Sequence, residues 1–262
     1  MLIRAVAATV CFSLLAGCAS PQRQQRSRQA AMAERILSQV DERADPGKVA
    51  ATDFALARQA RDEGQWSALL AYAAPGAQLH DASGVTDAAA WLTGRPDPAQ
   101  AMARAPREVW SSCDGSLAVS FGRSRGADGI IGSYAAVWQR QRGGSYKWTY
   151  MIGTPDVPQP PPPPPGDAVP DEDTIVVGAL QAITARAADC PQRERAADLP
   201  PPPPAPSAAG GAPEPVLTRS RDGTLAWRVD QTGPASWRMV VEWQRGGEWM
   251  QALAFALPDG ES

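Results

Sequence analysis

The sequence predicts an α+β protein in which helices precede a run of antiparallel strands. Three observations lead to this fold class. Apolar residues recur at helical spacing before residue 94, apolar runs joined by Asp-Gly and Gly-Gly turns follow from residue 107, and proline tracts divide the strands into two blocks. The chain has 262 residues, 44% of them apolar, which is enough for one domain with appendages.

The predicted helical part lies between residues 46 and 94. Asp45 followed by proline is typical of a helix start, and Gly64 of a helix end. The first helix is expected to place Phe54, Ala57 and Ala60 on its apolar face. We expect helices at 49–63, 66–74 and 86–92, with an extended segment at 77–80.

From residue 107 the pattern changes to strands. Asp114-Gly115 and Gly143-Gly144 stand between apolar runs, and their glycines supply the positive φ that tight hairpins require. A second block of strands begins after Pro215. The expected strands are 108–113, 116–123, 130–142, 145–152, 217–220, 224–230, 236–245 and 248–256.

The last strand block repeats part of the first. Residues 114–118 (DGSLA) match 222–226 (DGTLA), and 137–140 before one Gly-Gly pair resemble 241–245 before another. The second copy is about five residues tighter. A degenerate duplication and two separate meanders with the same turn chemistry are both open interpretations, and we prefer the second.

A proline-rich insert is expected at 154–215. Eighteen of the 26 prolines lie between Pro155 and Pro215, and 160–165 and 200–204 are uninterrupted proline runs. Such runs form polyproline II rods without internal hydrogen bonds. Between them the apolar spacing predicts a helix over 173–188.

The N-terminus has the organisation of a bacterial export signal. Arg4 precedes an apolar run at 5–16, which is shorter than the roughly 20 residues of a membrane span. The run ends in Leu-Ala-Gly-Cys at 15–18, which resembles the lipobox of bacterial lipoproteins. The resemblance implies that 1–17 form a signal peptide, that Cys18 is lipidated with palmitate-type chains, and that 18–45 form a tether able to become helical. The alternative is an ordinary secretory signal.

The lipobox resemblance also implies a location. Ser20 rather than Asp follows Ala19, which by resemblance to the enterobacterial sorting rule favours the outer membrane. We therefore expect a lipid-anchored protein that faces the periplasm. That compartment permits disulfides. We expect Cys113 and Cys190 to bond and close a loop of 78 residues, with two free thiols as the alternative.

Residues 46–153 resemble the nuclear transport factor 2-like superfamily, the cone-shaped fold of SnoaL-like polyketide cyclases and ketosteroid isomerase. The resemblance implies helices that lie against a strongly curved antiparallel sheet and enclose a pocket. Family members often form a homodimer through the open face of the sheet. The C-terminal strands at 216–262 either extend this sheet or form a second one that covers the face. The stretches that carry the resemblance are 54–58, 64–66, 69–73, 88–94 and the hairpin 134–152.

The same resemblance points to candidate site residues. Asp81 falls on the catalytic-base position of ketosteroid isomerase, but Arg58 and Ala136 stand where the oxyanion donors would be. Asp81 is therefore better interpreted as a turn residue, and His80 as an exposed or hydrogen-bonded histidine. Candidates for lining an apolar pocket, with core packing as the alternative, are Tyr72, Trp91, Tyr134, Trp138 and Trp148.

Composition excludes some classes of function. A net charge of −3 argues against nucleic-acid binding, and the single histidine excludes a His-rich metal site. We expect no cofactor and no metal. The sequence favours a non-enzymatic envelope lipoprotein that acts as a binding or interaction module, with an envelope protein or a small apolar ligand as partner. The alternatives are a small apolar-ligand-binding protein and an isomerase, cyclase or dehydratase that uses Asp81.

The lipobox interpretation predicts the effect of one substitution. Cys18→Ser removes the thiol that would be acylated, so the variant is expected to carry no acyl chain. Cys11→Ser is the matched control, since Cys11 lies inside the signal peptide and its loss should leave lipidation unchanged. Metabolic labelling with an alkyne-tagged fatty acid measures both. Continued labelling of the Cys18→Ser protein would refute the interpretation.

Overall fold

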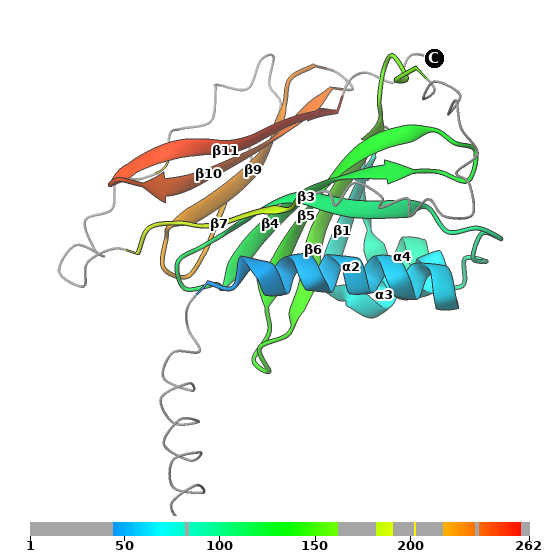
Figure 1. The fold of residues 1–262 in the computed structure, drawn as a ribbon, viewed down its shortest axis with the longest axis horizontal. Coiled ribbons are helices and arrows are strands. Elements are labelled where there is room, and N and C mark those ends of the chain that lie inside the picture. Colours follow the sequence, from blue (N-terminus) through cyan, green and yellow to red (C-terminus); the bar gives the residue numbers. More distant parts are fainter. Residues whose placement is uncertain are drawn as a thin grey trace, which may run out of the picture. The chain divides into compact units, whose positions relative to one another are not determined.

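The computed structural model describes residues 44–81, 84–161, 182–190, 202, 217–233 and 236–257. These residues form a mixed α+β fold with a seven-stranded sheet, a four-stranded sheet and helices (Figure 1). The predicted α+β class is confirmed, but the large sheet is mixed where an antiparallel one was expected. The expected signal peptide, the tether up to residue 43 and, apart from Pro202, the proline runs after residue 161 lie outside the described residues.

The helices are α2 (Pro46–Glu63), α3 (Gln65–Tyr72) and α4 (Ala88–Leu92). The Asp45 side chain caps α2 by accepting a hydrogen bond from the Lys48 backbone N–H at 2.9 Å. Gly64 separates α2 from α3 with φ 121°, and a Cβ there would lie 2.2 Å from an oxygen of Asp97. Glycine is therefore required at this junction. Phe54 is 42% exposed, so its expected place on the buried face is wrong.

The seven-stranded sheet is mixed, with two parallel pairs, β1–β6 and β3–β7, among antiparallel ones. The expected extended segment at 77–80 is part of β1, and β2 takes the first residues of the helix expected at 86–92. In sheet order the strands are β2 (Gly84–Asp87), β1 (Ala73–Asp81), β6 (Tyr146–Pro155), β5 (Ile131–Arg140), β4 (Leu117–Arg125), β3 (Ala103–Ser111) and β7 (Thr184–Ala187).

The helix expected at 173–188 is wrong in its described part. Thr184–Ala187 is strand β7, which pairs in parallel with β3. The expected disulfide between Cys113 and Cys190 is present, and closing its loop contributes about 4–5 kcal/mol in the chain-entropy model. The disulfide and the strand partner together hold this segment extended, so tertiary contacts override its helical spacing. Residues 173–181 lie outside the described part.

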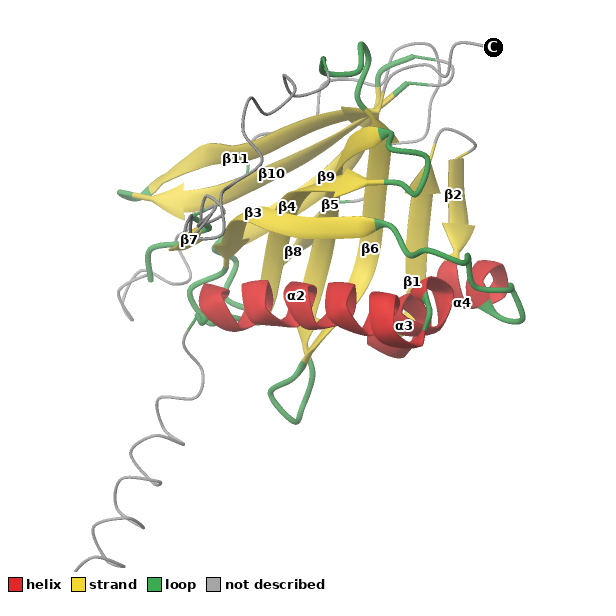
Figure 2. Ribbon diagram, turned by 45° about the vertical axis from the view of Figure 1, so that its right-hand side comes forward, coloured by secondary structure: helices red, strands yellow, loops and turns green. Residues whose placement is uncertain are grey.

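The C-terminal strands form a separate four-stranded antiparallel sheet. It packs on the face of the large sheet that is opposite the helices (Figure 2). The C-terminal strands therefore cover the large sheet instead of extending it. In sheet order they are β11 (Glu248–Leu257), β10 (Trp237–Arg245), β9 (Leu225–Gln231) and β8 (Thr218–Arg219).

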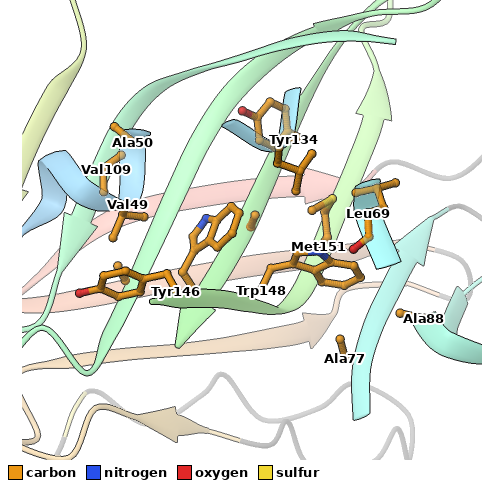
Figure 3. Packing of buried hydrophobic residues seen from close by; sticks show 14 of the residues in the cluster. Val49, Ala50, Leu69, Ala77, Ala88, Val109, Tyr134, Tyr146, Trp148 and Met151 are labelled. Atoms are coloured by element: carbon orange, nitrogen blue, oxygen red, sulfur yellow. Dashed lines mark hydrogen bonds between the residues drawn. The ribbon is translucent and has the colours of Figure 1, made fainter. Parts of the chain in front are cut away.

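Two apolar cores lie on the two faces of the large sheet. Along β5, Ala136 and Trp138 belong to the core beneath the helices, while Ala135 and Val137 belong to the core between the sheets. Figure 3 shows members of the helix-side core, in which the Trp148 Nε1–H donates to the Leu69 carbonyl at 2.9 Å. Among the described residues no helix is long and apolar enough to span a bilayer.

Candidate functional site

A cavity of about 380 Å³ lies on the helix side of the large sheet. Its walls come from α3, α4, the strands β1 to β6 and the loop between β4 and β5. Asp81 and Ile130 are exposed members of the wall, so this end of the cavity reaches solvent. The volume suits a small organic ligand. Apolar side chains of the wall include Trp66, Leu69, Leu79, Trp91, Met102 and Met151.

A buried ion pair lies at the cavity, where Arg104 is a wall residue and Asp53 is its buried partner. The Arg104 Nη2 from β3 lies 2.9 Å from the Asp53 Oδ1 from α2, with side chains 5% and 0% exposed. The other Asp53 oxygen accepts hydrogen bonds from the Ser120 and Tyr134 hydroxyls at 2.7 and 3.1 Å. Ser120 in turn accepts from the Trp138 Nε1–H at 2.9 Å. One carboxylate therefore ties α2 to three strands.

The surroundings of Arg104 explain how a buried charge is tolerated. Burial is the largest influence and acts to lower the pKa of Arg104, but Asp53 and Tyr134 together outweigh it, so the pKa rises and the guanidinium stays charged. The guanidinium carbon lies 3.9 Å from the Tyr134 ring centroid, as in a cation–π contact. The Arg104 Nη1 donates to the Met151 sulfur at 3.2 Å, which is a weak acceptor.

In this cluster Tyr134 is a hydrogen-bond donor and Asp53 is the acceptor. Burial raises the pKa of Tyr134, so its hydroxyl stays protonated and donates to Asp53. The Arg104 Nη2 and the Asp53 Oδ1 are close, but their angles do not meet hydrogen-bond geometry, so the two groups interact as an ion pair. Sequence reasoning missed both members of the pair. The signal was present, because Asp53 falls on the buried stripe of α2 between Val49 and Leu56.

The two residues singled out near the end of β1 have different surroundings. Asp81 is exposed at the strand end, pairs in register with Gly84 and lines the cavity. It is the last residue of β1, at the start of the connection to β2. His80 is 3% exposed, and its Nδ1 is hydrogen-bonded to the Tyr150 hydroxyl. Its ring meets Trp237 of the second sheet edge to face, with centroids 5.0 Å apart. His80 is thus part of the contact between the two sheets.

The five aromatic candidates separate into three groups. Trp91 and Tyr134 line the cavity, and Trp91 meets Trp66 edge to face at 5.0 Å. Trp138 and Trp148 are fully buried in the helix-side core and are not part of the wall. Tyr72 packs at the edge of that core. Among the described residues no group of three His, Cys, Asp or Glu side chains is arranged to bind a metal.

Comparison with known proteins finds a solved structure similar to part of the chain. It is described as a "putative ketosteroid isomerase" from Shewanella frigidimarina NCIMB 400. The two sequences are 17% identical, the similarity covers 41% of this chain and 92% of that one, and the TM-score is 0.27. No protein-family model matches this chain, and no curated protein matches it in sequence.

The buried ion pair predicts a large effect of one substitution. Asp53→Ala leaves the Arg104 charge buried without its carboxylate, which should lower the free energy of unfolding by about 3–5 kcal/mol. Asp62→Ala, at an exposed position of the same helix, should change it by less than about 0.5 kcal/mol. Urea denaturation measures both. Equal effects of the two substitutions would contradict the assignment of Asp53 as the buried partner of Arg104.

His80 predicts a pH dependence of stability. Burial lowers the pKa of His80 from its ordinary value of 6.5, although Asp81 acts in the opposite direction. The unfolded chain therefore binds this proton more readily, so the stabilisation is present above pH 6.5 and is lost as the pH falls below it. His80→Gln should flatten the fall in melting temperature just below that pH. An unchanged slope in the variant would assign the pH dependence to other groups.

Proposed function

We propose that this chain is a non-enzymatic binding protein that holds a small, largely apolar ligand in the cavity between its helices and the large sheet. The cavity is the observation that carries the proposal. Its volume is in the range of small-molecule sites, and apolar side chains surround a few polar groups, which is the usual composition of such sites. We infer that the domain at 46–153 is nuclear transport factor 2-like, which its helices, sheet and cavity support.

The wall of the cavity suggests the chemistry of the ligand. Trp66 and Trp91 offer flat surfaces to an apolar ring system. The Arg104 Nη1 donates only to the weak Met151 acceptor, so a ligand oxygen would be a better partner for it. Because Asp53 already balances the charge of Arg104, a neutral carbonyl or hydroxyl oxygen is sufficient. The proposed ligand is therefore an apolar ring compound with one such oxygen.

The proposal places this domain at the bacterial envelope. A lipid on Cys18 would anchor the chain, residues 18–45 would form the tether, and the domain would lie on the periplasmic side of the outer membrane. The lipobox at 15–18 supports the anchor. The Cys113–Cys190 disulfide supports an oxidising compartment, because such bonds form outside the reducing cytosol. A tethered binding protein would hold its ligand close to the membrane.

Catalysis by Asp81 is a second candidate function, favoured by the position of Asp81 on the cavity wall. An isomerase, cyclase or dehydratase would also need donors that stabilise a developing oxyanion. Tyr134 is the only tyrosine among the described residues of the wall, and its hydroxyl already donates to Asp53. Asp81→Asn separates the two functions, because it would abolish turnover that depends on this base and leave ligand binding intact.

Filling the cavity should abolish binding. Met102 lies on the wall, and Met102→Trp would place an indole in the ligand volume, whereas Met250→Trp adds the same ring at a 51% exposed position of β11. We expect N-phenyl-1-naphthylamine, a neutral apolar probe, to bind the wild type and Met250→Trp alike and to bind Met102→Trp about tenfold or more weakly. Native mass spectrometry of the full chain released from membranes measures the bound fraction.

The same spectra report any small molecule that the protein retains from the cell. Retention by the wild type and loss in Met102→Trp would support the proposal and give the mass of the natural ligand. Equal probe binding by all three proteins would place the probe outside the cavity. That result, without a retained ligand, would overturn the proposal.

A further inference from the structure

The four-stranded sheet repeats the strand pairing of β3–β6. In the first meander, Ser111 pairs with Ala118, and in the second, Arg219 pairs with Ala226. The next pairs also correspond, since Leu117↔Gln139 is matched by Leu225↔Trp243. The stretch from 118 to 137 corresponds to that from 226 to 241, which is four residues shorter. The sequence match of Trp-Gln-Arg at 138–140 with 243–245 is thus one residue out of structural register.

Both meanders carry a β-bulge at the same place. The pairing of β5 with β6 shifts between Val137 and Trp138, and the pairing of β10 with β11 shifts between Val241 and Glu242. These are corresponding positions in the register given above. A β-bulge is an irregularity in strand pairing, and a Gly-Gly turn does not require one. The repeated bulge is therefore evidence independent of the shared turn sequence.

The two Asp-Gly turns have the same internal hydrogen bonds. Asp114 and Asp222 each accept from the serine hydroxyl two positions earlier, at 2.6 Å in both turns. Each also accepts from the backbone N–H two positions later, at 2.9 and 3.1 Å. The turns are therefore built alike, down to the side chains that organise them.

The two turns also bind each other reciprocally. The Cys113 backbone N–H donates to the Thr224 hydroxyl at 2.9 Å, and the Arg221 backbone N–H donates to the Ser116 hydroxyl at 3.1 Å. Cys113 corresponds to Arg221 and Ser116 to Thr224, so each contact is the image of the other. Such reciprocity defines a two-fold relation like that of a symmetric homodimer interface. Two meanders that merely share turn chemistry need not meet in this way.

The buried faces of the two meanders also obey the two-fold relation. The sides that face each other are apolar in both, with Val119 and Val137 opposite Val241 and Leu257 in one core. The outer sides differ, because one bears helices and the other does not. On the outer side of the second meander, Arg228 forms ion pairs with Asp230 at 3.1 Å and with Glu242 at 2.6 Å. The corresponding residues on the helix-bearing side are Ser120, Gly122 and Trp138.

We propose that β8–β11 is a second copy of the β3–β6 meander and serves the domain as a built-in partner. It occupies the face of the large sheet on which the same meander of another chain would otherwise pack. The chain therefore uses this face for contacts within itself and forms no dimer through it. This replaces our preference for shared turn chemistry and is independent of the ligand proposed above.

The oligomeric state tests the built-in partner. Native mass spectrometry of the full chain should give a monomer, and chemical crosslinks between the β3–β6 and β8–β11 segments should join peptides of one chain. A mixture of isotopically labelled and unlabelled protein separates the two kinds of crosslink. Mixed-label crosslinks between these segments would show that another chain fills the face and would overturn the proposal. Same-label crosslinks alone would support it.

The two-fold relation is tested by substitutions at corresponding positions. Ser116→Ala and Thr224→Ala each remove the acceptor of one image contact, so both should lower the melting temperature. The fall should be larger for Thr224→Ala, because the Thr224 hydroxyl also bonds to the Asp222 carboxylate at 2.9 Å. The double variant should fall by less than the sum, because each loss loosens the same turn-to-turn contact. Ser145→Ala, at an exposed turn position, is the control and should change nothing. Falls that add independently in the double variant would overturn the two-fold relation.

Discussion

The burial of both faces of β5 is the constraint on which the rest of the structure depends. Residues 132–138 are all buried. Because side chains along a strand alternate between its two faces, both faces of β5 need a covering layer here. A single helical layer covers only one face of a sheet. The C-terminal strands cover the other, and their inner residues Met239 and Val241 share a core with Val137.

The polar cluster beside the cavity depends on one carboxylate. Asp53 joins α2 to β3, β4 and β5, and two of its partners, Arg104 and Tyr134, line the cavity. Buried ion pairs rarely add much stability compared with apolar packing. Asp53 holds Arg104 charged at the cavity wall, which is the position that the proposed ligand oxygen would require.

The two sheets are fastened together near the paired Asp-Gly turns. Beside the disulfide at Cys190, the Asp189 backbone N–H donates to the Gln244 carbonyl at 3.0 Å, and the Asp189 carboxylate accepts from the Gly246 N–H at 2.6 Å. The segment after β7 therefore contacts both sheets. This connection fixes the C-terminal sheet over the large sheet, which leaves the helix side as the location of the cavity.

Local patterns in the sequence determined the α+β class, most strand positions and the Asp45 helix start, because turn glycines, capping side chains and strand alternation act over a few residues. Only the tertiary structure decided the rest. Thr184–Ala187 is a strand because β3 is beside it, Asp53 is buried because Arg104 lies opposite, and Trp91 lines a cavity while Trp138 fills a core. These outcomes depend on partners distant in the chain, which local spacing does not specify.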